Sequence, residues 1–229
     1  MQNNVSLRLA KRIWEVVEKE FESGELFEKV SPITKELLRF WFCEPFISQR
    51  QFNFHKGQKQ SILNIIYLHE VLKINNVLEI YEQVAPDLLL ESDLFGAKET
   101  RNSLKESRYD LPKYLVKMAT GTGKTWVMHA LLIWQILNAK NEEEKSGRFT
   151  KNFLIVAPGL IVYDRLLDAY KGRLSENGDG RDFSTNDFVR NKDLFVPENY
   201  REEVFSFIQN NTVSKEEGIG SKITGNGLI

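Results

Sequence analysis

The sequence lacks the features that define several large classes of protein. It contains 1 cysteine, Cys43, so no disulfide can form within the chain and a disulfide-stapled secreted fold is excluded. Its longest apolar stretches, at 61–68 and 126–137, are shorter than the roughly 20 residues that a membrane-spanning helix needs. The 31 basic and 32 acidic side chains leave a net charge of -1, so no overall basic field marks a nucleic-acid binder. We therefore expect a cytoplasmic globular protein without membrane association, in which any DNA contact depends on local geometry.

The first 50 residues have the pattern of a helical region. Leu9, Ile13 and Val17 follow one another at helical spacing, and the turn-forming pair at 23–24 ends this helix. Ser31 before Pro32 is typical of a helix start, so a second helix is expected over 33–42. A third helix is expected from Gln58 to Leu72, and an insertion near 73–110.

The pattern changes after this insertion. Residues 113–118 read as a short strand, residues 125–137 as an apolar helix, and residues 153–158 as a parallel strand buried on both faces. A strand, a helix and a strand over about 45 residues form a βαβ unit. Further along, we expect a helix over 160–174, a polar surface loop over 175–188 and another strand over 203–209.

Between the first strand and its helix lies a loop, residues 118–125, that ends in Gly-Lys-Thr. Gly121 and Gly123 let the backbone turn with its amides pointing inward, and Lys124 can then reach the β- and γ-phosphates of a nucleotide. Thr122 completes the turn, and the Thr125 hydroxyl can bind Mg²⁺. The stricter pattern has a further glycine where this chain has Met118. The loop predicts ATP and Mg²⁺ as cofactors.

This loop resembles motif I of superfamily 2 helicases, most closely that of the ATPase-endonuclease (Res) subunits of type III restriction systems. Residues 153–166 resemble motif Ia of that family, residues 54–58 resemble the Q motif, and residues 218–229 resemble the stretch leading toward motif II. The resemblance covers roughly 50–229. It implies that Gln58 contacts adenine and that Pro158 and Gly159 lie near a DNA phosphate. It also implies double-stranded DNA and a methyltransferase (specificity) subunit as partners.

The expected fold is α/β: an incomplete RecA-like parallel sheet with flanking helices, a P-loop NTPase, preceded by a helical region. We place the helical region at 1–50 and the first RecA-like, helicase ATP-binding domain at 51–229, cut before motif II. No apolar strand in the sequence ends in the Asp-Glu pair that hydrolysis needs, so we expect no catalytic residue here and no turnover by the chain alone.

Two kinds of function remain open. The chain is either part of a type III restriction ATPase, which would cleave DNA when complete, or a stand-alone nucleotide-binding module that acts through a partner. Another superfamily 2 DNA helicase is a further alternative. The apolar end at Ile229 favours a truncated chain.

Overall fold

The computed structural model describes residues 5–91, 112–141, 147–175, 178, 180–217 and 227–228. The chain forms two compact units. Unit 1 contains Met1–Val30 and His55–Lys124, and unit 2 contains Ser31–Phe54 and Thr125–Ile229. These units do not follow the division expected at residue 51, which stays a prediction. Among the described residues, no helix is both long enough and apolar enough to cross a membrane.

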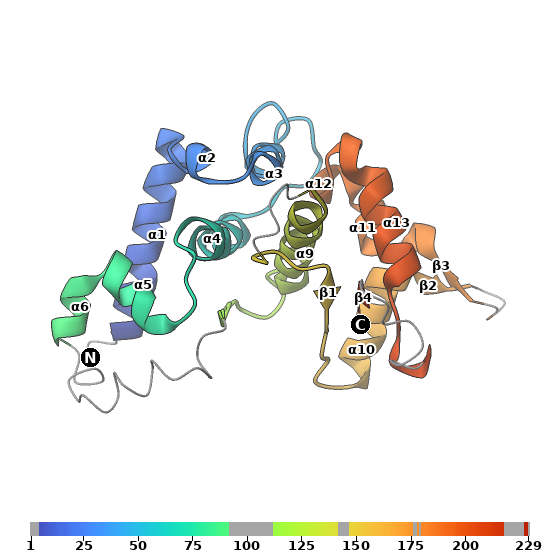
Figure 1. Ribbon diagram of the computed structural model, residues 1–229. Coiled ribbons are helices and arrows are strands. Elements are labelled where there is room, and N and C mark those ends of the chain that lie inside the picture. The colour runs from blue at the N-terminus through green and yellow to red at the C-terminus, as the bar shows by residue number, and fades with distance from the viewer. Residues whose placement is uncertain are drawn as a thin grey trace. The chain divides into compact units, whose positions relative to one another are not determined.

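The regular secondary structure described in unit 1 is all helical (Figure 1). Its elements are α1 (Val5–Ser23), α2 (Leu26–Lys29), α4 (Lys56–Ile66), the π-helix η1 (Tyr67–Val71), α5 (Val77–Val84) and α6 (Pro86–Glu91). The two helices expected here, from residue 5 to the turn at 23–24 and over 58–72, are confirmed. The expected insertion is partly ordered as α5 and α6, and its remainder at 92–111 lies outside the described residues.

Hydrogen bonds between charged and phenolic groups tie α1 to η1 within unit 1. The Glu20 carboxylate accepts from the Tyr67 hydroxyl at 2.9 Å and from the Lys29 ammonium at 2.9 Å. Burial, together with the Glu20 hydrogen bond, raises the pKa of Tyr67 to about 12. Tyr67 therefore stays neutral and acts as a donor, and the first turn of η1 is fixed against α1.

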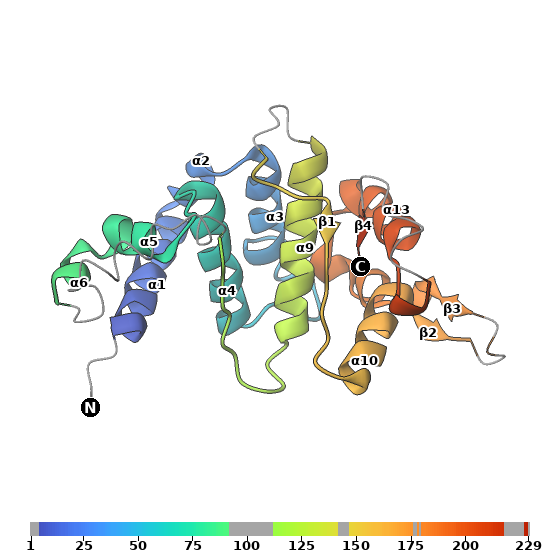
Figure 2. The ribbon, with the colours of Figure 1, turned by 60° about the horizontal axis from the view of Figure 1, so that its bottom comes forward.

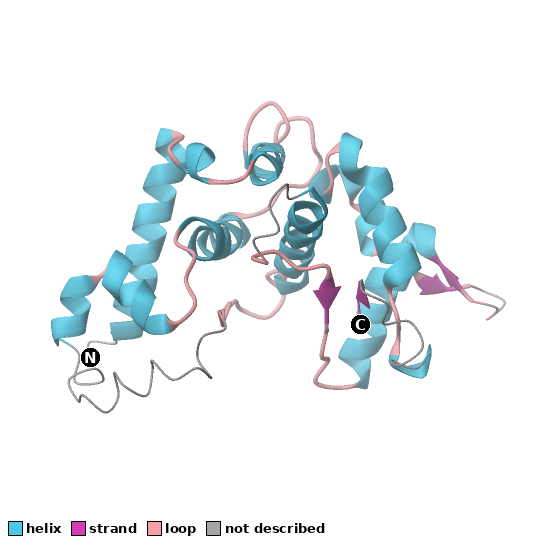
Figure 3. Ribbon diagram, viewed as in Figure 1, coloured by secondary structure: helices cyan, strands magenta, loops and turns pink. Residues whose placement is uncertain are grey.

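Unit 2 is built from helices with two very short sheets, which Figure 3 shows in magenta. Its elements are α3 (Pro32–Phe42), α9 (Lys124–Asn141), β1 (Asn152–Phe153), α10 (Leu160–Lys171), β2 (Arg173–Leu174), β3 (Arg181–Asp182), η3 (Phe183–Thr185), α11 (Asp187–Arg190), α12 (Lys192–Phe195), η4 (Glu198–Tyr200), α13 (Arg201–Asn211), η5 (Lys215–Glu217) and β4 (Gly227–Leu228). The expected helix at 33–42 is confirmed as α3, since Ser31 accepts from the Thr34 amide and Pro32 takes the first helical position.

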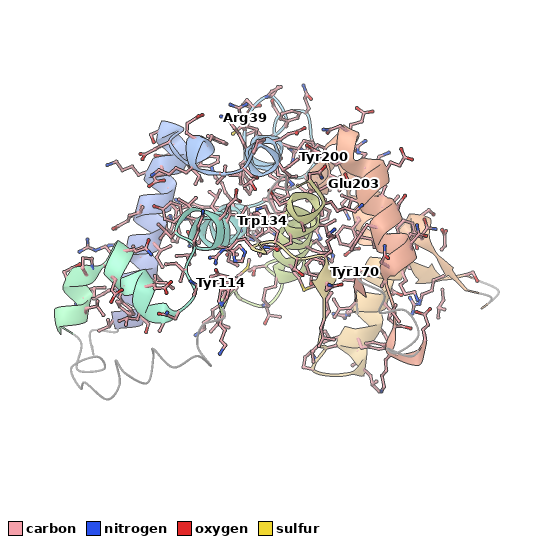
Figure 4. The ribbon with its side chains drawn as sticks, in the orientation of Figure 1. Arg39, Tyr114, Trp134, Tyr170, Tyr200 and Glu203 are labelled. Carbon is pink, nitrogen blue, oxygen red and sulfur yellow. The ribbon has the colours of Figure 1, made fainter. Side chains whose placement is uncertain are left out.

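The helix α9 forms the core of unit 2, and its Trp134 is labelled in Figure 4. Apolar side chains are buried around the helix, which is typical of a helix enclosed by other elements. The Trp134 indole donates to the Thr34 hydroxyl at 2.9 Å, and Asn138 donates to the same oxygen at 3.1 Å. Thr34 is fully buried on α3, so these bonds fix α3 against α9.

A second contact of α9 surrounds a histidine with aromatic rings. The His129 ring lies 4.4 Å from the Phe188 ring and 5.2 Å from the Tyr170 ring, centroid to centroid, and the side chain is fully buried. Burial lowers the pKa of His129, and Asp187, 3.4 Å from Nε2, only partly opposes this. His129 is therefore a neutral member of the core.

The parallel sheet is shorter than the sequence predicts. β1 pairs in parallel with β4, Asn152 opposite Gly227, which brings a later strand beside β1 (Figure 2). The expected burial of 153–158 on both faces is wrong, because Leu154 is 69% and Val156 is 78% exposed. Residues 113–118 form no ladder within the described part of the chain, and Leu115 is 92% exposed. These segments lack the covering neighbours that parallel strands need, so a RecA-like sheet stays a prediction.

The strand expected at 203–209 is wrong: these residues belong to α13. Val204, Phe207 and Ile208 are buried at spacings of three and four, which is the helical period. Glu202 and Glu203 occupy the first turn, where carboxylates favour a helix. The helical spacing of these apolar residues therefore decides the structure of the segment.

The polar surface loop expected at 175–188 is partly wrong. Its residues contribute to a hairpin of β2 and β3, and its end is buried, since Asn186 and Phe188 are 0% exposed. The preceding helix, α10, ends at Lys171 as the left-handed Gly172 breaks it, with φ 86°. A side chain at 172 would place its Cβ 1.8 Å from the Asp182 carbonyl oxygen, so only glycine permits this hairpin.

Candidate nucleotide-binding site

The predicted phosphate loop has the backbone that its glycines suggest. Gly121 has φ 80° and Gly123 has φ 71°, in the left-handed region that side chains disfavour. The loop then leads directly into α9, which begins at Lys124. Met118 occupies the position of the missing glycine. Its φ is not positive, since Lys73 is the only non-glycine residue with a positive φ in the described part of the chain, so a side chain is tolerated at position 118.

The side chains of the loop fold back onto its own carbonyls. The Lys124 ammonium donates to the carbonyl oxygens of Met118 at 2.9 Å and Ala119 at 2.8 Å. The Thr122 hydroxyl also donates to Ala119, at 2.7 Å. Lys124 is exposed, so its ammonium can exchange these neutral acceptors for a charged phosphate.

Two side chains at the start of α4 hold the loop from the side. His55 Nε2 lies 2.9 Å from the Thr122 carbonyl oxygen, and Gln58 Nε2 donates to the Gly123 carbonyl oxygen at 3.3 Å. His55 Nδ1 accepts from the backbone amides of Gly57 and Gln58, so the proton of the neutral ring is on Nε2 and is donated to Thr122. Successive loop carbonyls are thus anchored to one helix.

His55 and Gln58 also support each other as a reciprocal cap of α4. His55 is the N-cap, and the Gln58 carbonyl oxygen accepts from the His55 amide at 3.0 Å. No role for His55 was predicted from the sequence. A signal was present, because a capping side chain three residues before Gln58 fits the spacing of a capping box.

The adenine contact expected of Gln58 is not visible as an open amide. Gln58 is 3% exposed, and both ends of its amide are engaged, with Gly123 and with His55. A base could reach this amide only after a local movement. The adenine contact therefore stays a prediction, and the observed role of the side chain is to hold the loop.

The remaining predicted site residues lie in different surroundings. Thr125 follows Lys124 in α9 and is exposed. Gly159 is the N-cap of α10 and Pro158 precedes it, both exposed beside an apolar hollow of about 400 Å³. The N-cap residue of α10, Gly159, makes no side-chain capping bond, and amides at such a helix start can bind an anion.

Comparison with known families gives a match whose range includes this loop. The family described as "Type III restriction enzyme, res subunit" matches residues 51–222, well over half of the chain. The chain therefore belongs to this family of helicase-type, ATP-binding proteins of restriction systems, which have the P-loop NTPase fold. No curated protein and no solved structure gives a significant match.

Proposed function

We propose that this chain binds ATP with Mg²⁺ and is the ATP-binding part of a DNA-translocating ATPase of a type III restriction-modification system. The observation that carries the proposal is the loop at 118–124, in which two left-handed glycines precede an exposed lysine at the start of α9. Backbone amides in such a loop form a concave anion site. The proposed domain is the first RecA-like domain of the motor.

Each residue of the loop has a distinct part in nucleotide binding. The amides of Gly121, Thr122 and Gly123 would cradle the phosphates, and the Lys124 ammonium would neutralise charge on the outer ones. The Thr125 hydroxyl is the proposed ligand of Mg²⁺, which neutralises further phosphate charge when bound. The loop fits such a ligand, because a Cβ at Gly121 would meet no atom within 4 Å and the ammonium has only neutral acceptors to give up.

The proposed DNA contact lies in unit 2. Pro158 and Gly159 precede the uncapped N-terminus of α10, and a DNA phosphate there would accept from its first amides. Double-stranded DNA and a methyltransferase subunit that recognises the site are the proposed partners, and the complete protein is the proposed endonuclease. The Asp-Glu pair needed for hydrolysis is not in the sequence, so turnover by residues 1–229 alone should be near background.

The test is to measure nucleotide binding by the purified chain with calorimetry, in the presence and in the absence of Mg²⁺. We expect ATP and ADP to bind more tightly with Mg²⁺, and Lys124→Ala to weaken both. Equal binding by Lys124→Ala would contradict the site. Binding that double-stranded DNA does not alter would favour the alternative of a nucleotide-binding module acting through a partner.

A further inference from the structure

Unit 2 contains a second hollow, separate from the phosphate loop, whose wall includes a cation without a hydrogen-bond partner among the described residues. This groove, of about 1040 Å³, lies between α3 and the turn that follows it on one side and residues 193–201 on the other. Arg39, labelled in Figure 4, lines the first side, and Tyr200, also labelled, donates to the lining residue Glu36 from the second segment. The side formed by α3 precedes residue 51, where the family match begins, so the groove joins a segment outside the match to one inside it.

Arg50 is the unusual residue of this groove. Its guanidinium carbon lies 4.4 Å from the centre of the Phe40 ring, which is a cation–π contact. Both terminal nitrogens are buried, and neither has a hydrogen-bond partner within the described chain. Burial lowers the pKa of Arg50, but a guanidinium remains charged at any physiological pH. A buried cation without an acceptor is unfavourable, so the site is completed by an anion.

Two carboxylates that line the groove are engaged elsewhere. Asp193 accepts from Arg201 at 2.6 Å. Glu36 accepts from the Tyr200 hydroxyl at 2.7 Å and from Asn199 at 2.9 Å. The burial of Tyr200 and its bond to Glu36 raise the pKa of Tyr200 to about 12, so this hydroxyl remains a donor. The described part of the chain thus places the negative charge of Asp193 near Arg50 but supplies no acceptor oxygen to its terminal nitrogens.

The rest of the lining indicates what kind of anion fits. The apolar part of the wall includes Phe46, which is 38% exposed and lies 5.4 Å from the Phe40 ring. Three carboxylates, Glu36, Asp193 and Glu198, line the groove beside four cationic side chains. A DNA backbone carries a phosphate at every step and would meet repulsion from those carboxylates, whereas a single carboxylate can approach Arg50 alone.

We propose that this groove docks a segment of a protein partner that carries one carboxylate next to an apolar side chain. The carboxylate forms paired hydrogen bonds with the guanidinium of Arg50, and the apolar side chain covers Phe46. Because the terminal nitrogens of Arg50 are shielded from solvent, a small movement of side chains in the wall accompanies binding. The groove does not depend on the phosphate loop, so this interaction is independent of nucleotide.

Selection from a random peptide library tests the proposal with the full chain of 229 residues. Peptides enriched on the wild-type chain should share an Asp or Glu within two positions of an apolar residue. One enriched peptide is then synthesised with its acidic residue and with the matching amide, and binding is measured by fluorescence anisotropy. We expect the amide peptide, and separately Arg50→Met with the acidic peptide, each to bind at least tenfold more weakly. Arg173→Met, which removes an exposed arginine on β2, and Lys124→Ala should both bind as wild type does.

The thermal stability of Arg50→Met shows whether Arg50 awaits a carboxylate from a partner or already forms an ion pair within the chain. Methionine keeps an unbranched stem over Phe40 and removes the unpaired charge, so its unfolding midpoint should equal or exceed that of the wild type. A fall of more than about 4 °C would mean that Arg50 already has a partner in the chain, and the proposal would be wrong. Selection of no acidic motif, equal binding by Arg50→Met, or Arg50-dependent binding of an oligonucleotide would each overturn it.

Discussion

The contact of His55 with the phosphate loop can be separated from its role as a helix cap by two substitutions. His55→Ala removes the cap of α4 and the hydrogen bond to the Thr122 carbonyl. His55→Asn retains a side chain that caps helices well but is too short to reach Thr122. The two variants therefore share the loss of the loop contact and differ in the loss of the cap.

The expected magnitudes follow from these two contributions. An N-cap stabilises by about 1 kcal/mol, so His55→Ala should lower the free energy of unfolding by roughly that amount, and His55→Asn by much less. The bond to Thr122 is exposed, and an exposed neutral hydrogen bond is worth about 0.5 to 1 kcal/mol, toward the lower end of the usual range. If loop order limits nucleotide binding, both variants should bind MgATP about two- to fivefold more weakly, since 1.4 kcal/mol corresponds to tenfold.

Urea unfolding and calorimetric titration with MgATP measure the two effects. Asn76→Ala is the matched control, because Asn76 caps α5 in the same unit without touching the loop. It should lose similar stability and keep its affinity. If His55→Asn binds as wild type does, the loop does not depend on this contact. If Asn76→Ala loses as much affinity as the His55 variants, the loss reflects general destabilisation.

Three further results are expected. Lys124→Ala should weaken ATP binding by roughly 10- to 100-fold in calorimetry, since a hydrogen bond to a charged group is worth about 1.5 to 3 kcal/mol, while Lys124→Arg keeps part of it. Burial lowers the pKa of His129 in the folded chain below its ordinary 6.5. The unfolded chain therefore takes up the proton first, so the contribution of His129 to folding stability is full above pH 6.5 and is lost as the pH falls toward the folded-state pKa. Urea unfolding between pH 7.5 and 5.5 should show this loss, and His129→Leu should make the free energy of unfolding less dependent on pH. Trp134→Phe removes the indole donor to Thr34 and should lower stability by about 1 to 2 kcal/mol in the same assay, and an unchanged midpoint would show that α3 does not depend on this bond.

Local signals in the sequence were sufficient for the helices. The cap at Ser31, the proline at 32 and the periodic apolar residues of α1 each act within a turn or two, so they are readable from neighbouring residues. The same is true of the phosphate loop, whose glycines at 121 and 123 have the positive φ that only their residue type favours. In α13, the helical spacing of the apolar residues was also present in the sequence, although a strand was predicted there.

Features that depend on distant partners could not be predicted in this way. Whether 113–118 is a ladder strand depends on neighbours supplied by other parts of a sheet, and no pattern within the segment contains that information. The hydrogen bond between His55 and Thr122 joins residues 67 positions apart, and the residues around His55 carry no information about that distant partner. The groove around Arg50 likewise brings together two segments that carry no shared motif.

The bond between Trp134 and Thr34 also bears on how the chain folds as it is synthesised. Its partners are separated by 100 residues, so α3 leaves the ribosome well before the helix that covers it. At about 5 to 20 residues per second, the delay is roughly 5 to 20 s. During that time the nascent chain displays the side chains of Leu37, Leu38 and Trp41, all fully buried in the finished unit. We expect a chaperone that recognises short apolar helices to bind this segment until α9 emerges.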